Sequence, residues 1–303
     1  MRIKKYLCIF LYLGLSPSLF FSLLMGCQTA SRSSQPAPVS TGDPTFMPAT
    51  PRGPTLSTAE GAQHAISWWR PTVGLTWQWQ LGDAEIDSSI EAEVYDVDLY
   101  VPQFMIDELH AKGRMVICYI SVGSWEDWRP DKDQFPPEVL GNDYAGWPGE
   151  KWLDIRQIDK LAPIMRARLD LCKSKGFEAV EPDNMETYTN NTGFSLTYED
   201  QLRYAIWLAD EAHQRGLAIG QKNAFDQVKD LVDHFDFAIT EDIIFYNLAE
   251  DMKPFIEAGK PVFAAEYTDH GGNFASYCEN SHKLKFSVIL KNRDLDAWMQ
   301  TCP

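Results

Sequence analysis

Carboxylates recur in this sequence at the ends of short runs that are rich in β-branched and aromatic residues. The acidic residues at or just after such ends are Asp96, Asp98, Glu126, Asp127, Glu181, Asp183, Glu241, Asp242 and Glu266. A purely structural sheet does not require carboxylates at so many ends. Two carboxylates across the width of a sugar can hydrolyse a glycosidic bond, because one protonates the leaving oxygen while the other attacks the anomeric carbon or activates water.

Alternation along the runs indicates which carboxylates share a face. Side chains point to opposite faces at successive strand positions, so Asp183 lies on the face of Ala179, and Glu241 lies on the face of Ile239. Apolar neighbours of this kind suit the interior of a barrel. Asp183 and Glu241 are therefore candidate catalytic carboxylates, and a salt-bridged structural role for one of them is the alternative.

The elements that must position this pair form a repeating pattern. The β-rich runs are residues 76–81, 94–100, 114–122, 177–183, 217–223, 235–241, 261–268 and 286–291. Helical patterns fill most of the gaps, at residues 102–112, 156–175 and 197–215. Eight strands with helical crossovers predict an α/β fold, a (β/α)8 TIM barrel in a single domain. A doubly wound open sheet is the alternative, although the Gly-rich turn typical of that fold is missing after the first run.

In such barrels the active site lies at the C-terminal ends of the strands. The candidate substrate-binding residues at those ends are Asp98, Tyr119, Trp125, Glu126, Asp127, Trp147, Glu181, Asn184, Tyr188, Lys222, Asn223, Tyr246, Glu266 and Tyr267. The aromatic residues could stack on sugar faces or pack under loops. Glu181 and Glu266 could contact substrate or pair with Lys222 inside the barrel. We expect Lys222 to orient a carboxylate or lower its pKa, Asn223 to hydrogen-bond a sugar hydroxyl, and His213 to be structural.

Charge and composition exclude one class of function. The chain has 303 residues with 27 basic and 43 acidic side chains, a formal net charge of −16. A nucleic-acid-binding protein needs a basic patch, and basic residues cluster only at the N-terminus. No nucleic-acid partner is expected, and the acidic surface indicates either solubility alone or a cationic substrate.

The N-terminal residues resemble an export signal with a lipid attachment site. Arg2, Lys4 and Lys5 precede an apolar run that ends at Gly26 and Cys27, as in a bacterial lipobox. This pattern predicts a signal peptide over residues 1–26, lipidation of Cys27, a Ser/Thr/Pro-rich tether over 27–60 and the barrel over 61–303. A plain secretory signal or a retained anchor is the alternative. The protein is expected to be exported and anchored in the membrane of the cell envelope, which is the outer membrane in a Gram-negative cell.

The sequence around each of the remaining four cysteines indicates its state. Cys118 lies in an apolar strand-like run and Cys172 in a helical one, so both are predicted to be buried free thiols. Cys278 and Cys302 flank the last strand and either form a disulfide or stay reduced. No metal-binding motif is present, so neither a metal nor another cofactor is expected.

The sequence between Trp77 and Tyr267 resembles glycoside hydrolase family 114. The matching runs are Cys118-Tyr119-Ile120-Ser121-Val122-Gly123-Ser124, Glu126-Asp127-Trp128-Arg129-Pro130-Asp131, Gly146-Trp147-Pro148-Gly149-Glu150-Lys151-Trp152-Leu153-Asp154-Ile155-Arg156, Glu181-Pro182-Asp183-Asn184, Ala212-His213, Gly216-Leu217, Lys222-Asn223 and Glu266-Tyr267. The resemblance implies a (β/α)8 barrel with endo-α-1,4-polygalactosaminidase activity on α-1,4-linked galactosamine-containing polysaccharide. The family's catalytic Asp and Glu fall on Asp183, as nucleophile, and Glu241, as general acid/base.

One loop departs from the family pattern. The family usually continues its sixth-strand Glu with Gln and Cys, whereas this chain has Asp242 and Ile243 after Glu241. The expected partner is a cationic or partly deacetylated polysaccharide, bound by a monomer. A glycosidase acting on another polysaccharide, or a non-catalytic carbohydrate-binding lipoprotein, is the alternative. Retention and inversion both stay open, because the outcome depends on the separation of the carboxylates.

Overall fold

The structure is a computed structural model that describes residues 67–82 and 85–303. The predicted leader, Cys27 and the tether lie outside the described residues. Among those described, no helix is long and apolar enough to cross a membrane.

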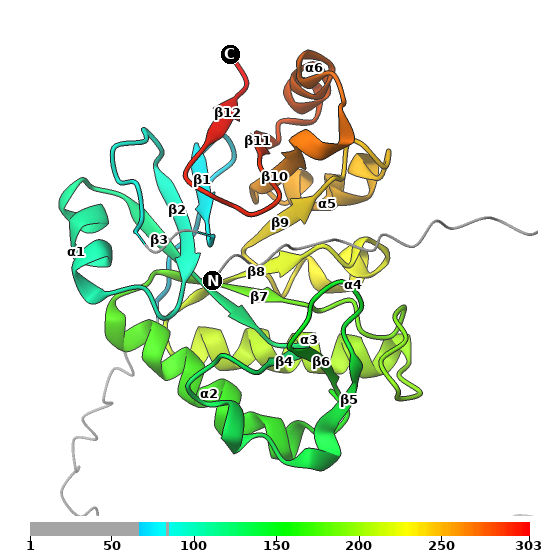
Figure 1. Cartoon of the computed structure of the whole chain (residues 1–303). Coiled ribbons are helices and arrows are strands. Elements are labelled where there is room, and N and C mark those ends of the chain that lie inside the picture. The colour runs from blue at the N-terminus through cyan, green and yellow to red at the C-terminus, as the bar shows by residue number, and fades with distance from the viewer. Residues whose placement is uncertain (1–66, 83–84) are drawn as a thin grey trace, which may run out of the picture. The chain divides into compact units, whose positions relative to one another are not determined.

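Eight parallel strands form the main sheet, and their spatial order follows the chain (Figure 1). A doubly wound sheet would reverse its strand order, and this sheet does not, so the predicted TIM barrel is confirmed. Each predicted run contains one of the strands, which are β1 (Trp77–Gln80), β2 (Val94–Asp98), β3 (Met115–Ser121), β7 (Ala179–Asp183), β8 (Ala218–Lys222), β9 (Phe237–Glu241), β10 (Val262–Tyr267) and β11 (Ser287–Lys291). The seam between β1 and β11 is bridged by side chains, since Trp77 Nε1 donates to the Ser287 carbonyl at 2.9 Å.

Helices connect and cover the strands. They are α1 (Gln103–Ala111), α2 (Ile158–Lys175), α3 (Tyr198–Gln214), α4 (Val228–Leu231), α5 (Lys253–Glu257) and α6 (Phe274–Leu284). The first three fall within the predicted ranges. A reciprocal capping box starts α3, in which Thr197 and Asp200 each bond the other's backbone N–H. The helix α2 ends at Gly176, whose φ of 92° lies in the left-handed region that favours glycine.

Short elements between these were not predicted. A second sheet lies between β3 and α2 in the sequence, with the antiparallel order β4 (Ser124–Glu126), β6 (Glu150–Leu153), β5 (Leu140–Asp143). The strand β12 (Met299–Thr301) pairs antiparallel with β11. Turns of 3₁₀ helix occur at Lys132–Gln134, Pro137–Val139, Phe225–Gln227, Ala249–Met252 and Thr268–His270. Strands of three or four partly polar residues carry too little periodicity to be recognised in the sequence.

The lower barrel interior is filled by aromatic rings. The Trp77 and Phe263 ring centroids are 5.3 Å apart, and Phe237 meets Phe263 edge-on at 5.9 Å. Gly220 leaves room for this packing, because a Cβ there would lie 2.4 Å from the Phe237 ring. Full burial of each such ring is worth about 1.5–3 kcal/mol. These closely packed rings fill the barrel interior below the polar residues at the C-terminal ends of the strands.

The prediction of free thiols at Cys118 and Cys172 is wrong, because they form a disulfide with their Cα atoms 6.0 Å apart. Cys118 lies on the outer face of β3 and Cys172 on the buried stripe of α2, so packing the helix on the strand brings them together. Each looked like an ordinary core residue because the periodicity of one element does not reveal its neighbour. Cys278 and Cys302 also form a disulfide, which decides the question that the sequence left open.

Candidate active site

The ammonium of Lys222 is the centre of a charged cluster at the C-terminal ends of β7, β8 and β9. Its Nζ lies 2.7 Å from Glu181 Oε1, 3.0 Å from Asp183 Oδ1 and 3.3 Å from Glu241 Oε2. The Lys222 side chain is only 2% exposed. Burial lowers the pKa of Lys222, but the three carboxylates outweigh burial and raise that pKa well above its ordinary value. The lysine is therefore a permanent cation.

Asp183 is held as an anion. Burial raises the pKa of its carboxyl, but the Lys222 ammonium and hydrogen bonds from Lys222 and Tyr119 hold the pKa below its ordinary value. The Tyr119 hydroxyl donates to Oδ2 at 2.8 Å. The side chain keeps 20% of its surface exposed. An ionised, oriented and accessible carboxylate of this kind can act as a nucleophile.

Glu241, at the end of β9, also contacts the ammonium of Lys222. The Tyr267 hydroxyl donates to Glu241 Oε1. The Asn223 side-chain carbonyl accepts the backbone N–H of Glu241 at 3.0 Å, so Asn223 fixes the end of β9. The Glu241 side chain is 23% exposed. Its two oxygens thus have defined partners while one side stays open to solvent.

A second pair of carboxyls lies deeper in the barrel. Both oxygens of Asp96 and the Oε2 of Glu181 are buried and receive no N–H donor. Burial, followed by the charge of Glu181, raises the pKa of Asp96 well above its ordinary value. Burial also raises the pKa of Glu181 to about 7, although Lys222 opposes the shift. One proton held on Asp96 and donated to Glu181 pairs one oxygen of each group, so the cluster carries one negative charge fewer than its four carboxyls suggest.

The chain is similar in sequence and in structure to known proteins. Residues 58–303 match the glycoside-hydrolase family GH114. The chain belongs to this family. It is 38% identical to Aspergillus fumigatus Ega3, whose crystal structure contains galactosamine; the match covers 78% of this chain and 98% of Ega3, with a TM-score of 0.74.

Two further similar proteins are more distant in sequence. The glycoside hydrolase domain of PelA from Pseudomonas aeruginosa is 12% identical, with a TM-score of 0.60 over 75% of this chain and 98% of that domain. An uncharacterized protein of Deinococcus radiodurans is 24% identical over 214 residues, which is 64% of this chain and 69% of that protein. Its membership of GH114 makes this chain a glycoside hydrolase by family, with a TIM barrel as its scaffold.

The loop after Glu241 is held by an ionic network. Asp242 Oδ2 contacts Arg293 Nη1 at 2.8 Å and His270 Nε2 at 3.0 Å. The Arg293 guanidinium also lies 3.7 Å from the centre of the Tyr267 ring, which carries the hydroxyl bonded to Glu241. The network therefore connects the altered loop to the partner of a predicted catalytic residue.

Glu266 supports the same loop from the outer face of β10. Its oxygens accept the backbone N–H groups of Ile244 at 2.8 Å and Phe245 at 3.1 Å. Burial raises the pKa of Glu266 to about 7. Of the two acids that we considered as partners of Lys222, only Glu181 contacts it, because Glu266 points away from the barrel interior.

Two predicted sugar contacts, Asp98 and Glu126, are paired with Arg129. Arg129 Nη1 lies 2.6 Å from Asp98 Oδ2, and Nε lies 2.6 Å from Glu126 Oε2. Glu126 is buried, whereas Asp98 retains 22% exposure. The three residues bind the end of β2 to β4 and the loop after it.

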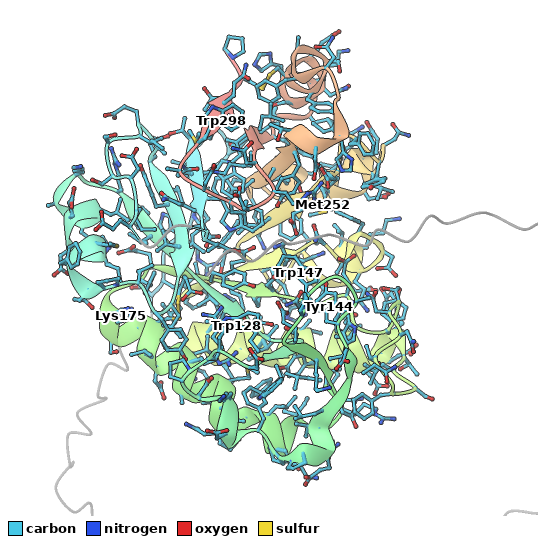
Figure 2. All side chains as sticks on the ribbon, in the orientation of Figure 1. Trp128, Tyr144, Trp147, Lys175, Met252 and Trp298 are labelled. Atoms are coloured by element: carbon cyan, nitrogen blue, oxygen red, sulfur yellow. A yellow bond between two sulfur atoms is a disulfide. The ribbon has the colours of Figure 1, made fainter. Side chains whose placement is uncertain are left out.

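The remaining predicted residues lie in loops that follow the strands or on the second sheet and its turns. Asn184 donates to the hydroxyls of Ser121 and Ser124 at 2.9 and 3.0 Å, which ties the loop after β7 to β3 and β4. Trp147 lies beside Tyr144 (Figure 2). The others are placed as follows: Trp125 donates to the Lys132 carbonyl, Asp127 is exposed beside Gly149, Tyr188 packs edge-on against Tyr198, and Tyr246 packs edge-on against Phe245. His213, predicted to be structural, contacts Asp236 at 2.8 Å on the segment that precedes β9.

Two residues near the Lys222 cluster were missed from the sequence. Glu186 lies in the loop after β7, and Tyr144 lies on the segment between β5 and β6 (Figure 2). Burial raises the pKa of Tyr144 well above its ordinary value, and the charges of Asp183 and Glu186 add to this shift. The signal for Glu186 was its place two residues after Asn184 in a recognised motif. Tyr144 had no signal, because its hairpin was not predicted.

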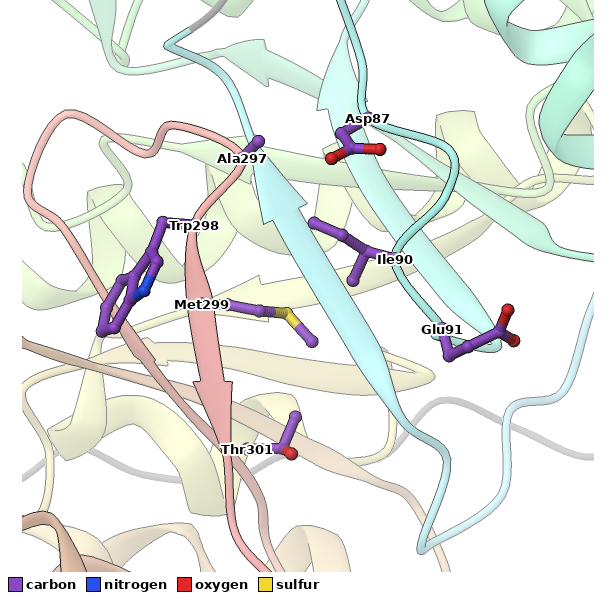
Figure 3. A pocket seen from close by; sticks show the side chains of 7 residues that line it. All are labelled: Asp87, Ile90, Glu91, Ala297, Trp298, Met299 and Thr301. Carbon is purple, nitrogen blue, oxygen red and sulfur yellow. The ribbon is translucent and has the colours of Figure 1, made fainter.

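A shallow groove elsewhere shares no residue with this cluster. It has a volume of about 420 Å³ and lies between β12 and the β1–β2 connection, lined by Asp87, Ile90, Glu91, Ala297, Trp298, Met299 and Thr301 (Figure 3). Among the described residues, no group of three or more His, Cys, Asp or Glu side chains has an arrangement that could hold a metal ion.

Proposed function

We propose that this protein is an endo-acting glycoside hydrolase that cleaves α-1,4-linked galactosamine-containing polysaccharide. The observation that carries the proposal is the pair Asp183 and Glu241 on one buried lysine, at 3.0 and 3.3 Å, at the ends of the two strands that flank β8 in a GH114 barrel. The 38% identity to Ega3, which was crystallised with galactosamine, supports the choice of sugar. Asp183 is the proposed nucleophile and Glu241 the proposed general acid/base.

The first chemical step breaks the glycosidic bond. Glu241 in its protonated form gives a proton to the leaving oxygen while an Asp183 oxygen attacks the anomeric carbon from the opposite side. The electron pair of the broken C–O bond goes to the leaving oxygen, which departs as a hydroxyl. Lys222 and Tyr119 keep Asp183 ionised before the attack, through the contacts at 3.0 and 2.8 Å.

The second step releases the sugar. Glu241, now a carboxylate, takes a proton from water, and the water oxygen attacks the anomeric carbon. The bond between that carbon and the Asp183 oxygen breaks, so Asp183 returns to its ionised form and Glu241 to its protonated form. Tyr267 and Asn223 hold the Glu241 side chain and backbone in one place through both steps.

The geometry supports a retaining outcome. Inverting enzymes separate their carboxylates by about 6.5–9.5 Å to admit a water molecule, and retaining enzymes by about 5–5.5 Å. Oxygens of Asp183 and Glu241 both contact the same nitrogen, at 3.0 and 3.3 Å, which favours the shorter separation.

The charge of the molecule supports a cationic polymer. A net charge of −16 attracts the ammonium groups of deacetylated galactosamine and speeds encounter at low ionic strength. Association should therefore weaken as salt is added, since a surface potential is screened over about 10 Å at 0.1 M salt.

The test is a reducing-end assay with the full chain on deacetylated and acetylated galactosaminan. We expect new reducing ends from the deacetylated polymer with wild type, and a loss of at least about a thousandfold in both Asp183→Asn and Glu241→Gln. Galactosaminan left intact by folded wild type would refute the assignment. Proton NMR of the first product would show retained α configuration if Asp183 is the nucleophile.

We also propose that the protein is exported and anchored through a lipid on Cys27, as a monomer. The disulfides Cys118–Cys172 and Cys278–Cys302 support an oxidising compartment. Labelling of growing cells with a palmitate analogue should mark wild type and leave Cys27→Ala unlabelled. Label on the variant would contradict the site.

A further inference from the structure

We propose that Arg293 is a positioning residue for the reaction, which acts on Glu241 through the ring and hydroxyl of Tyr267. The inference deepens the proposed function and rests on it, because that function gives Glu241 its role. Within the described part of the chain, Arg293 contacts neither Asp183 nor Glu241, so its effect on them is indirect.

The guanidinium of Arg293 is held in one orientation by two carboxylates. Its Nε and Nη2 lie 2.9 and 2.8 Å from the two oxygens of Asp269, and Nη1 lies 2.8 Å from Asp242 Oδ2. Its Nη2 also lies 3.0 Å from His270 Nε2. A planar group with contacts on these two sides cannot rotate without breaking a charged hydrogen bond. The side chain is 13% exposed, so solvent screens these contacts only weakly.

These contacts join the ends of three neighbouring strands. Asp242 follows β9, Asp269 lies in the turn after β10, and Arg293 follows β11. The orientation of the guanidinium is therefore fixed by the barrel itself rather than by one loop.

The guanidinium lies over the ring of Tyr267. The Arg293 Cζ is 3.7 Å from the ring centre, and Tyr267 is only 2% exposed. A cation over a buried aromatic face is attracted by the ring electrons and draws them toward itself. Burial and the charge of Glu241 raise the pKa of the Tyr267 hydroxyl, and the charge of Arg293 opposes that rise. The cation therefore makes the hydroxyl a stronger hydrogen-bond donor.

The Tyr267 hydroxyl transmits this effect to Glu241. It donates to Glu241 Oε1, and Lys222 contacts the other oxygen at 3.3 Å. A hydrogen bond donated to a carboxylate favours its ionised form, and a stronger donor favours it more. The proposed acid/base must be protonated in the first step and ionised in the second, so the balance between the two forms affects the rate. Arg293 thus shifts this balance toward the ionised form and holds the donor in place.

Other charged and titratable groups share these surroundings. Those that contact Glu241 or Arg293, or whose charges interact with theirs, are Lys222, Asp183, Tyr267, Asp242, Asp269, His270, Glu186 and Tyr144. Apart from Tyr267, all of them stay unchanged when Arg293 is replaced in wild type and in Tyr267→Phe. Their titrations therefore cancel when those four forms are compared.

The decisive comparison is a double-mutant cycle of Arg293→Met and Tyr267→Phe. Methionine keeps an unbranched side chain without the charge, and phenylalanine keeps the ring without the hydroxyl. In protein labelled at the glutamate carboxyl carbons, the NMR signal of Glu241 is the one that Glu241→Gln loses. We expect Arg293→Met to move the midpoint of its titration to higher pH by about 0.5–1 unit. The same replacement in Tyr267→Phe should move the midpoint much less.

The same four forms are then compared on deacetylated galactosaminan. We expect kcat of Arg293→Met to fall about ten- to a hundredfold with little change in KM. Adding Arg293→Met to Tyr267→Phe should cause little further loss, because the hydroxyl through which Arg293 acts is already absent.

Arg215→Met is the matched control. Arg215 is 17% exposed and also contacts two carboxylates, Asp170 at 2.6 Å and Glu211 at 2.7 Å. It lies after α3 and before the start of β8, whereas the catalytic pair lies at the C-terminal ends of the strands. This variant should lower the free energy of unfolding and leave both kcat and the Glu241 midpoint unchanged.

A second background keeps the test valid if Arg293→Met does not fold. Asp242 is 2% exposed, so removal of Arg293 leaves a buried carboxylate without its cation. In Asp242→Asn that lone charge is absent, while Asp269 is 51% exposed and can be solvated. The cycle built on Asp242→Asn should show the same dependence on the Tyr267 hydroxyl.

Each result separates this inference from the proposed function. An unchanged Glu241 midpoint in Arg293→Met, or an equal shift with and without the Tyr267 hydroxyl, would overturn the role of Arg293. A loss of kcat in Arg215→Met as large as that in Arg293→Met would also overturn it. If the midpoint shifts through Tyr267 but wild type cleaves no galactosaminan, the proposed hydrolysis fails and the control of Glu241 by Arg293 stands.

Discussion

Replacing Lys222 by methionine tests whether one buried cation controls the whole cluster. The Lys222 ammonium contacts three carboxylates at 2.7–3.3 Å, and its side chain is 2% exposed. Methionine matches its length but removes the charge. Leaving buried anions without their partner lowers the free energy of unfolding by about 3–5 kcal/mol. This is a large share of a typical domain's unfolding free energy, which is about 5–15 kcal/mol.

The pH dependence of activity should change in a defined direction. Asp183 must be ionised to attack, and its pKa now lies below the ordinary value: burial raises it, and the Lys222 charge more than offsets that. A cation beside a carboxylate lowers the pKa by about 1–3 units. Without Lys222 the acidic limb of the kcat/KM profile should therefore move up by about 1–3 pH units. The loss of stability should be larger at pH 7 than at pH 4, because protonated carboxyls need no cation.

The assay is the reducing-end rate on deacetylated galactosaminan between pH 3 and pH 8, with urea unfolding at both ends of that range. Lys260→Met is the control, because Lys260 is a partly buried lysine that donates to the Phe235 carbonyl at 2.6 Å on the segment before β9. Lys260→Met should lower the free energy of unfolding without shifting the acidic limb of the kcat/KM profile. An acidic limb that stays in place in Lys222→Met, with only a lower plateau, would refute the assigned role of the lysine.

Other predictions follow from the same contacts. Asp96→Asn should reduce the loss of stability with rising pH. The raised pKa of Asp96 makes folding bind a proton, and the stability that this proton adds is lost as pH rises, at about 1.4 kcal/mol per pH unit. If the unfolding free energy from urea changes equally between pH 5 and pH 8 in wild type and variant, the shared proton is contradicted. The double variant Cys118→Ala/Cys172→Ala opens a loop of 54 residues and should lose about 4 kcal/mol by denaturant unfolding without a change in polymer activity. Tyr119→Phe removes the 2.8 Å hydrogen bond to Asp183. The acidic limb of its kcat/KM profile should move to higher pH by less than that of the Lys222 variant, and the plateau of kcat/KM should keep the same order of magnitude. An unchanged pH profile would show that the hydroxyl does not stabilise the Asp183 anion.

The eight strands and the inward position of Asp183 and Glu241 could be derived from the sequence because both depend on local regularity. A strand alternates its faces over two residues, so Ala179 and Ile239 mark the inner face before any fold is known. The rule that parallel strands place their C-terminal ends together then brings the two acids to one end of the barrel. The start of α3 at Thr197 is equally local, since its capping partner is three residues away.

The pairing of charges and sulfurs was decided by tertiary packing. Glu181 and Glu266 occupy similar strand ends, yet one contacts Lys222 and the other holds a loop outside the barrel, because their strands present them to opposite faces. Cys118 and Cys172 meet only because α2 packs on β3. No spacing within either element encodes the distance to its neighbour.

Glu186 shows where local reasoning stops. Alternation along β7 is valid up to Asp183, and then Asn184 takes a φ of 64° and turns the chain. Once the backbone leaves the extended region, the period of two no longer predicts where the next side chain points. The position of the loop residues after Asn184, Glu186 among them, therefore depends on how the loops after β7 and β8 pack on the barrel. The sequence determined the scaffold and the catalytic candidates, and tertiary packing determined which charges and sulfurs pair, because these contacts join residues far apart in the chain.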